Sequence, residues 1–165
     1  MDFVRQRLVD LEYLLELDYE NLSEHRVELS ITSSPSMKNE TKQRIKREII
    51  PRIRKYELEY WSLLKQALGS STVATEIEAK RTVTDLAENI AVIQQYKIPD
   101  EVSQQLKLIL DKLNEPETAA TAKAKFIVSI IPGMLAYEFE LDTESALRQA
   151  FQPLKKLFLK PIPER

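Results

Sequence analysis

Apolar residues recur along the first thirty positions at the spacing of one long amphipathic helix. Their steps of four, three, four, seven and seven residues keep them on one helical face. Asp18 and His25 occupy the two positions that the seven-residue steps skip. The pattern predicts a helix from about residue 2 to residue 31, ended by turn-forming residues at 32–36. The seam residues are Val4, Leu8, Leu11, Leu15, Leu22 and Leu29.

A second apolar seam predicts a helix that begins near Ser36 and ends near Ala67. Ser36 is the expected N-cap, and Gly69-Ser70-Ser71 ends the element. Pro51 lies inside the pattern, where it removes a helical hydrogen bond and clashes with the preceding turn. We therefore expect a kink or a short break near Ile50. The seam residues are Ile45, Ile49, Ile53, Tyr56, Tyr60, Leu63 and Ala67.

Charge indicates that these two helices pair with each other. Residues 10–24 contain six acidic residues and no lysine or arginine, whereas residues 42–55 contain seven basic residues and a single acid, Glu48. A chain reversal near Pro35 would lay the acidic segment beside the basic one. Exposed ion pairs contribute only about 0.2–1 kcal/mol each, so they select the pairing while apolar burial stabilises it. The sequence predicts an antiparallel, coiled-coil-like helical hairpin over residues 1–68.

Residues 72–159 are predicted to form a second, small helical unit. Helices are expected at 72–96, from Pro99 to about residue 113, and at 118–131, where Pro132-Gly133 should end the helix. A last helix begins at Asp142 or Thr143, and Pro153 should interrupt it. Residues 160–165 are predicted to form a tail.

An alternating pattern follows the third of these helices. Leu135, Tyr137, Phe139 and Leu141 alternate with polar or small residues up to Asp142. A period of two is typical of a strand, so residues 135–142 are predicted to be an extended segment. No partner strand is evident in the sequence. An extended arm, an edge offered to another chain, or a misjudged piece of helix remain open.

Composition favours a mostly α-helical protein and excludes several kinds of chemistry. The 165 residues include no cysteine and only two glycines, which argues against thiolate catalysis, cysteine-ligated zinc and phosphate-binding glycine loops. The net charge of −2 gives no overall reason to expect nucleic acid as a partner. No apolar run has the length of a membrane span, and charges interrupt the N-terminal apolar stretch, so we expect neither span nor signal peptide. A cytoplasmic location and no cofactor are the resulting expectations.

Few residues are candidates for a functional site. His25 is the single histidine, and its seam position favours a half-buried or interfacial residue over a general base. The basic run 42–55 has the acidic helix as its partner, which speaks against nucleic acid. The apolar stretch 126–131 is short and favours core over a membrane surface. Glu138, Glu140 and Asp142 would share one strand face, which is more typical of a solvated face than of a calcium site.

Three stretches of the chain resemble a helical module of cyanobacterial multidomain signalling and conflict proteins. In those proteins the module accompanies caspase-like, NACHT ATPase or formylglycine-enzyme-like domains, among the effector-associated adaptors. Pro51 departs from the uninterrupted second helix of that module. The stretches are Leu17-Asp18-Tyr19-Glu20-Asn21-Leu22 with Ser33-Ser34-Pro35, Ile45 and Glu57-Leu58-Glu59-Tyr60; Leu110-Asp111-Lys112-Leu113-Asn114-Glu115-Pro116; and Ile131-Pro132-Gly133 with Tyr137-Glu138-Phe139-Glu140-Leu141-Asp142-Thr143-Glu144 and Leu147-Arg148.

The resemblance implies an adaptor that recruits or multimerises effector domains through helix–helix contacts. We therefore expect a non-catalytic interaction domain with a protein partner or self-association, and a homodimer is one expected form. A membrane-associated or pore-forming module using residues 126–139 is the alternative, and an enzyme is the least favoured class. The candidate interaction residues are His25, Tyr137, Glu138, Phe139, Glu140, Leu141 and Asp142.

Overall fold

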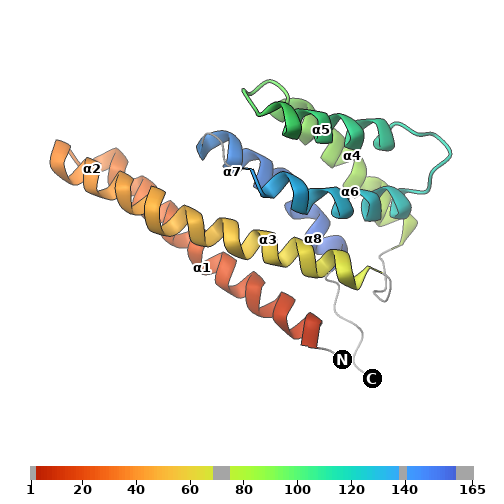
Figure 1. The fold of residues 1–165 in the computed structure, drawn as a ribbon, viewed down its shortest axis with the longest axis horizontal. Coiled ribbons are helices and arrows are strands. Elements are labelled where there is room, and N and C mark those ends of the chain that lie inside the picture. Colours follow the sequence, from red (N-terminus) through yellow and green to blue (C-terminus); the bar gives the residue numbers. More distant parts are fainter. Residues whose placement is uncertain (1–2, 69–74, 138–140, 159–165) are drawn as a thin grey trace. The chain divides into compact units, whose positions relative to one another are not determined.

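Every regular element in the described part of the chain is helical, which confirms the predicted mostly α fold (Figure 1). The computed structural model describes residues 3–68, 75–137 and 141–158, with the side chains of 141–145 left out. Contacts divide the chain into two compact units, Met1–Leu63 and Leu64–Arg165, so the boundary falls inside a helix. The predicted turn at Gly69-Ser70-Ser71 and the predicted tail at 160–165 lie outside the described residues.

Helix α1 (Phe3–Ile31) has the extent that the apolar seam predicts. Its buried residues follow steps of three, four, three and four, so they form one continuous face of the helix. Asp18 belongs to this face although it carries a charge, because a partner on the opposing helix neutralises it (below). The buried residues are Leu8, Leu11, Leu15, Asp18 and Leu22.

The second arm of the hairpin is a helix in three parts: α2 (Pro35–Arg44), η1 (Ile45–Ile49) and α3 (Ile50–Ala67). It begins two residues earlier than predicted, because Ser34 rather than Ser36 is the N-cap. The Ser34 hydroxyl accepts a 3.4 Å hydrogen bond from the backbone N–H of Met37. Pro35 occupies the first helical position, where its missing N–H would have had no partner.

A π-helical turn marks the position at which the sequence predicts a break. In η1 the backbone widens, and the N–H of Ile50 bonds to the carbonyl of Ile45, five residues earlier. Pro51 follows directly, and a proline ring would clash with the carbonyl four residues before it in a regular α-helix. The wider turn accommodates the proline without ending the helix, which is a usual role of such bulges. The predicted disturbance near Ile50 is therefore confirmed as a bulge within a continuous arm.

Polar contacts establish that the two arms run antiparallel (Figure 1). Arg52 Nε donates a 2.8 Å hydrogen bond to Asp18 Oδ1, which confirms the predicted pairing of the acidic segment with the basic one. Nearer the N-terminus, Arg7 Nε and Nη2 donate to the two carboxylate oxygens of Glu59 at 2.6 and 2.9 Å. An early residue of α1 thus meets a late residue of α3. The buried isoleucines of the second arm are Ile45, Ile49, Ile50 and Ile53.

The second unit contains α4 (Glu76–Ile93), α5 (Asp100–Leu113) and α6 (Ala120–Leu135), with α6 packed against both α4 and α5. Each helix buries one apolar face, as their spacing predicts. Their fully buried residues include Leu86 and Ile90 of α4, Leu106 and Ile109 of α5, and Ile127 and Ile131 of α6.

The last two helices, α7 (Leu141–Ala150) and α8 (Gln152–Phe158), both contact α4. The helix is interrupted at Phe151, between α7 and α8. Pro153 then lies in the first turn of α8, where a proline is tolerated. This confirms the predicted interruption of the final helix by Pro153.

The prediction that Pro132-Gly133 ends the third helix of this unit is wrong. Helix α6 continues through both residues to Leu135. Ile131, Met134 and Leu135 are all buried, so burial of the last turn outweighs the hydrogen bond that Pro132 cannot make. Gly133 lies inside α6 and has no positive φ, so it does not adopt the left-handed conformation in which a glycine often ends a helix.

The predicted extended segment at 135–142 is also wrong wherever the structure describes it. Leu135 is the last residue of α6, Tyr137 lies in the following bend, and Leu141 and Asp142 begin α7. Residues 138–140 lie outside the described part. The alternation misled because Leu135 owes its burial to the helical face that it shares with Ile131 and Met134, not to a strand.

Candidate interaction site

Helix α1 carries a second apolar stripe on the side away from its buried seam. Each stripe residue follows a seam position by two residues, and two residues turn an α-helix by about 200°. The steps of the stripe are four, three, four, three and four, so it stays on one face of the helix from residue 13 to residue 31. We call this the α1 outer stripe, and it consists of Tyr13, Leu17, Glu20, Glu24, Val27 and Ile31.

The apolar members of the α1 outer stripe are open to solvent. Their exposed fractions are 62% for Tyr13, 44% for Leu17, 56% for Val27 and 77% for Ile31. Single exposed apolar residues are ordinary on a protein surface. Four large ones at a strict helical spacing form an ordered face, which is typical of a helix that packs against a partner.

Two exposed carboxylates, Glu20 and Glu24, occupy the centre of the stripe. Helix α1 offers no exposed cation to balance them, because its three arginines are half-buried and it contains no lysine. The α1 outer stripe is therefore an apolar face with an acidic centre.

The second arm has the opposite character. Of its charged residues, Glu40 and Glu48 are exposed acids, and Arg44 makes a loose 3.8 Å ion pair with Glu40. Exposed cations outnumber these acids and extend along η1 and both flanking helices. The exposed cations whose spacing of three and eight residues keeps them on one side of the arm are called the basic face, and they are Arg44, Arg47 and Lys55.

The ion pairs between the arms place these two surfaces at the same level of the hairpin. Asp18 faces Arg52, so in antiparallel arms Glu24 of α1 lies near the level of Lys46. The Arg7–Glu59 pair extends the same alignment toward the N-terminus, and its hydrogen bond holds the pKa of Glu59 below its ordinary value. The acidic centre of one arm and the basic face of the other are thus level with each other, each on its own exposed surface.

A polar cluster lies between the arms, and its central carboxylate is buried. The Tyr19 hydroxyl donates a 2.9 Å hydrogen bond to Glu57 Oε2, and Glu57 is completely buried. Burial, and next the nearby carboxylates of Glu12 and Glu57, raise the pKa of Tyr60 well above its ordinary value. Because Glu57 has no exposed surface, its carboxylate is not presented to a dissolved substrate, and the cluster aligns the two arms.

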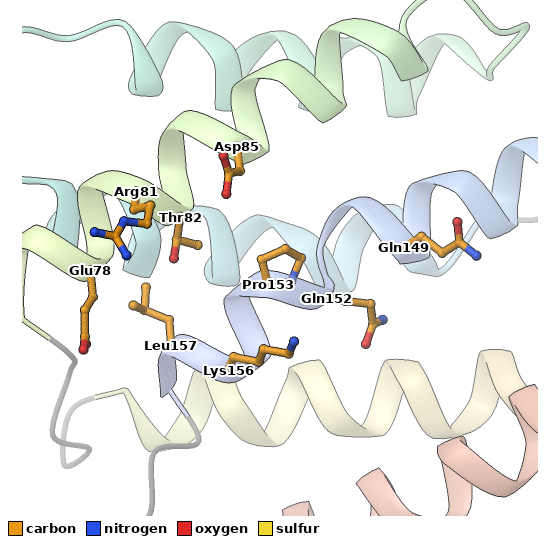
Figure 2. Close-up of a pocket in the computed structure, with 9 residues that line it drawn as sticks. All are labelled: Glu78, Arg81, Thr82, Asp85, Gln149, Gln152, Pro153, Lys156 and Leu157. Atoms are coloured by element: carbon orange, nitrogen blue, oxygen red, sulfur yellow. The ribbon is translucent and has the colours of Figure 1, made fainter.

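The second unit has an open groove of about 530 Å³ along α4 (Figure 2). Figure 2 shows Thr82 and Asp85 extending from α4 toward Pro153 and Leu157 of α8. Both signs of charge line the groove, so it selects no single class of small ligand by electrostatics. Its remaining lining residues are Glu78, Arg81, Gln149, Gln152 and Lys156.

The structure does not assemble the predicted site residues into one place. His25 lies in α1, half-buried, with its Nδ1 at 2.8 Å from the carbonyl oxygen of Asn21 in the same helix. Tyr137 lies in the bend that follows α6, with 38% of its surface exposed. Glu138, Phe139 and Glu140 lie outside the described residues. For Leu141 and Asp142 only the backbone is described, in the first turn of α7.

The α1 outer stripe was missed at the level of sequence, although its spacing is visible there. The stripe follows the same seven-residue period as the buried seam and is offset from it by two residues. Its two central glutamates also belong to the acidic run 10–24. They therefore interrupt the apolar pattern of the stripe, so that its helical period is not apparent from the apolar residues alone.

Within residues 3–68, 75–137 and 141–158, no three acidic or histidine side chains come together in a group that could hold a metal ion. The same residues include no helix with the length and apolarity needed to cross a bilayer.

The class that the fold defines is an all-helical protein with two compact units in its described residues. Comparison with protein families, with curated proteins and with solved structures gives no match to this chain.

Proposed function

We propose that this chain is a non-catalytic interaction domain, an adaptor that recruits or multimerises effector domains in bacterial signalling. The observation that carries the proposal is the α1 outer stripe. A helix that already buries one face against a neighbour has no folding need for a second ordered apolar face. Such a face loses its contact with water when a partner helix covers it, which is the driving force of helix-in-groove recognition.

The alternative, a membrane-associated module using residues 126–139, has less support. Ile127, Val128 and Ile131 are completely buried in the second unit, where α6 packs on α4 and α5. Insertion into a bilayer would require these residues to leave that core.

Site-specific photocrosslinking tests the proposed function. A benzophenone side chain is placed at Leu17 or at Val27, and the chain is irradiated in a lysate of its native cell. We expect discrete covalent adducts, because a docked partner holds its C–H bonds next to these positions. Mass spectrometry then identifies each crosslinked protein.

The matched control places the same group at Leu108 of α5, which is exposed to a similar degree, 52%. Random collisions would label Leu108 as strongly as the stripe positions. Equal labelling at the two sites, or no adduct at Leu17 and Val27, would refute an interaction face on α1.

A further inference from the structure

The surfaces of the hairpin carry the chemistry of both sides of one interface. We infer that the partner of the α1 outer stripe is a second copy of this chain, which docks through its basic face. Such a contact, called head-to-tail here, joins two different surfaces of hairpins that lie side by side. This inference rests on the proposed function and names the partner of the same surface. Glu20 and Glu24 of one copy then lie against Arg44 and Arg47 of the next.

Charge opposes the pairing of like surfaces. If two α1 outer stripes packed antiparallel about a twofold axis near residue 22, Glu20 of each copy would face Glu24 of the other. Four carboxylates would then meet at the centre of the apolar contact, where like charges repel strongly. Two basic faces would repel each other for the same reason. The acidic centre of one arm is complementary to the basic face of the other, so the favoured contact between hairpins joins different surfaces of the two copies.

The register of the hairpin makes this contact geometrically simple. Because Asp18 pairs with Arg52, the acidic centre and the basic face lie at the same level on opposite arms. Hairpins placed side by side in one orientation therefore bring the two surfaces together without a shift along the helix axis. The neighbouring helices of adjacent copies remain antiparallel, as they are within one copy.

Apolar groups match at both ends of this contact. Ile31, next to the reversal of the chain, comes near the level of Met37 of the adjacent copy, and Met37 is 51% exposed. Toward the other end, Tyr13 comes near the level of the exposed Lys55. A lysine stem and ammonium over a tyrosine ring form a favourable packing and cation–π contact.

A head-to-tail contact leaves one free acidic stripe and one free basic face on every assembly. Growth is then open-ended unless the rotation between copies closes a ring. An array of this kind would multimerise any effector domain joined to the chain, which is the action proposed above.

Charge reversal tests the inference with the full chain. Variant E20K/E24K makes the stripe basic, and variant R44E/R47E makes the basic face acidic. Light scattering over rising protein concentration, to about 0.5 mM, should show growing mass for the wild type. Each variant alone should associate at least tenfold more weakly. An equimolar mixture of the two, and the chain with all four changes, should regain association, because each restores opposite charges across the contact.

Circular dichroism confirms that each variant is folded, and E101K/D111K on α5, which reverses two exposed acids of the second unit, should associate like the wild type. Association should also weaken between about 0.05 M and about 0.5 M salt. A wild type that stays monomeric throughout would overturn the inference. So would an R44E/R47E variant that associates as well as the wild type, because that result requires a contact without the basic face.

The crosslinking experiment separates this inference from the proposed function. Adducts at Val27 that contain only other proteins, with no self-association, would overturn the head-to-tail contact and leave the proposed function standing. Absence of any stripe adduct would remove both.

Discussion

The ion pair between Asp18 and Arg52 should respond very differently to the loss of its two members. The Asp18 side chain is 9% exposed, whereas that of Arg52 is 41% exposed. An arginine released from the pair can therefore turn into water. An aspartate released from it stays among the leucines of the seam, and its Oδ2 already has no hydrogen-bond partner.

These exposures set the expected magnitudes. Arg52→Met leaves a buried, unpaired carboxylate and should lower the free energy of unfolding by about 2–4 kcal/mol. Asp18→Leu loses a charged hydrogen bond of about 1.5–3 kcal/mol. It gains about 1.5–3 kcal/mol from a leucine on the seam. The free energy of unfolding should therefore stay within about 1 kcal/mol of wild type or rise.

Urea unfolding at neutral pH measures these changes through Trp61. It is the single tryptophan of the chain, lies in the hairpin unit and is 1% exposed, so its fluorescence reports on this unit. Adding Asp18→Leu to Arg52→Met should recover at least about 1.5 kcal/mol, because the stranded carboxylate is removed. The exposed Lys46→Met is the control and should change stability by less than about 0.5 kcal/mol. Equal losses in Asp18→Leu and Arg52→Met would refute the reasoning.

Three further predictions concern local features of the two units. The free energy of unfolding of Gly133→Ala should lie within about 1 kcal/mol of wild type in thermal unfolding, because the gain in helix propensity offsets the displacement of the Gln105 amide, 2.9 Å from the new Cβ. Gly133→Leu should lower it by about 1–3 kcal/mol, because the larger side chain overpacks α5 against α6. A smaller loss in Gly133→Leu than in Gly133→Ala would contradict this. Glu76 accepts hydrogen bonds from the N–H groups of Ala120, at 2.7 Å, and Thr121, at 3.1 Å, and these bonds lower its pKa. The stability that the Glu76 carboxylate contributes is thus complete above about pH 4.5 and lost as pH falls through the lowered pKa. Glu76→Gln should therefore lower the melting temperature at pH 7 and converge with wild type in acid, whereas a constant difference at all pH values would count against this explanation. Pro51→Ala should raise the free energy of unfolding by about 1–2 kcal/mol, because restoring a helical N–H outweighs the larger conformational entropy of the unfolded chain. A net loss of stability in urea unfolding would show that the π turn needs the proline.

The sequence was most informative where one period runs without interruption. The apolar seam of α1 and the turn residues after it predict the whole element Phe3–Ile31. Charge then predicts which helix it pairs with, and the Asp18–Arg52 contact confirms the pairing. The Arg7–Glu59 pair was not predicted, because its charges run opposite to the acidic and basic runs. Only the three-dimensional register brings these two residues together.

Local signals misled where burial opposed them. Pro132 and Gly133 both mark helix ends in a sequence, yet α6 continues to Leu135 because its last turn is buried. The alternation after it suggested a strand, but the structure has a bend at Tyr137 and a new helix from Leu141. In both cases the free energy gained by burying apolar surface in the unit is larger than the local preference of the chain. The acids of the α1 outer stripe concealed the candidate site in a comparable way, since its period is apparent only when charged and apolar positions are read as one face.

The polar groups of the hairpin connect its folding to its proposed contact. A slip of one arm by seven residues would still turn the apolar seam of α1 toward the second arm, because the α1 seam repeats with that period. It would, however, separate Asp18 from Arg52 by about 10 Å, and it would strand the buried carboxylate of Glu57 away from the Tyr19 hydroxyl. These polar contacts therefore select one register among several that apolar burial alone would allow. The selected register is also the one that holds the acidic centre level with the basic face, so the groups that specify the fold also align the two halves of the proposed interface.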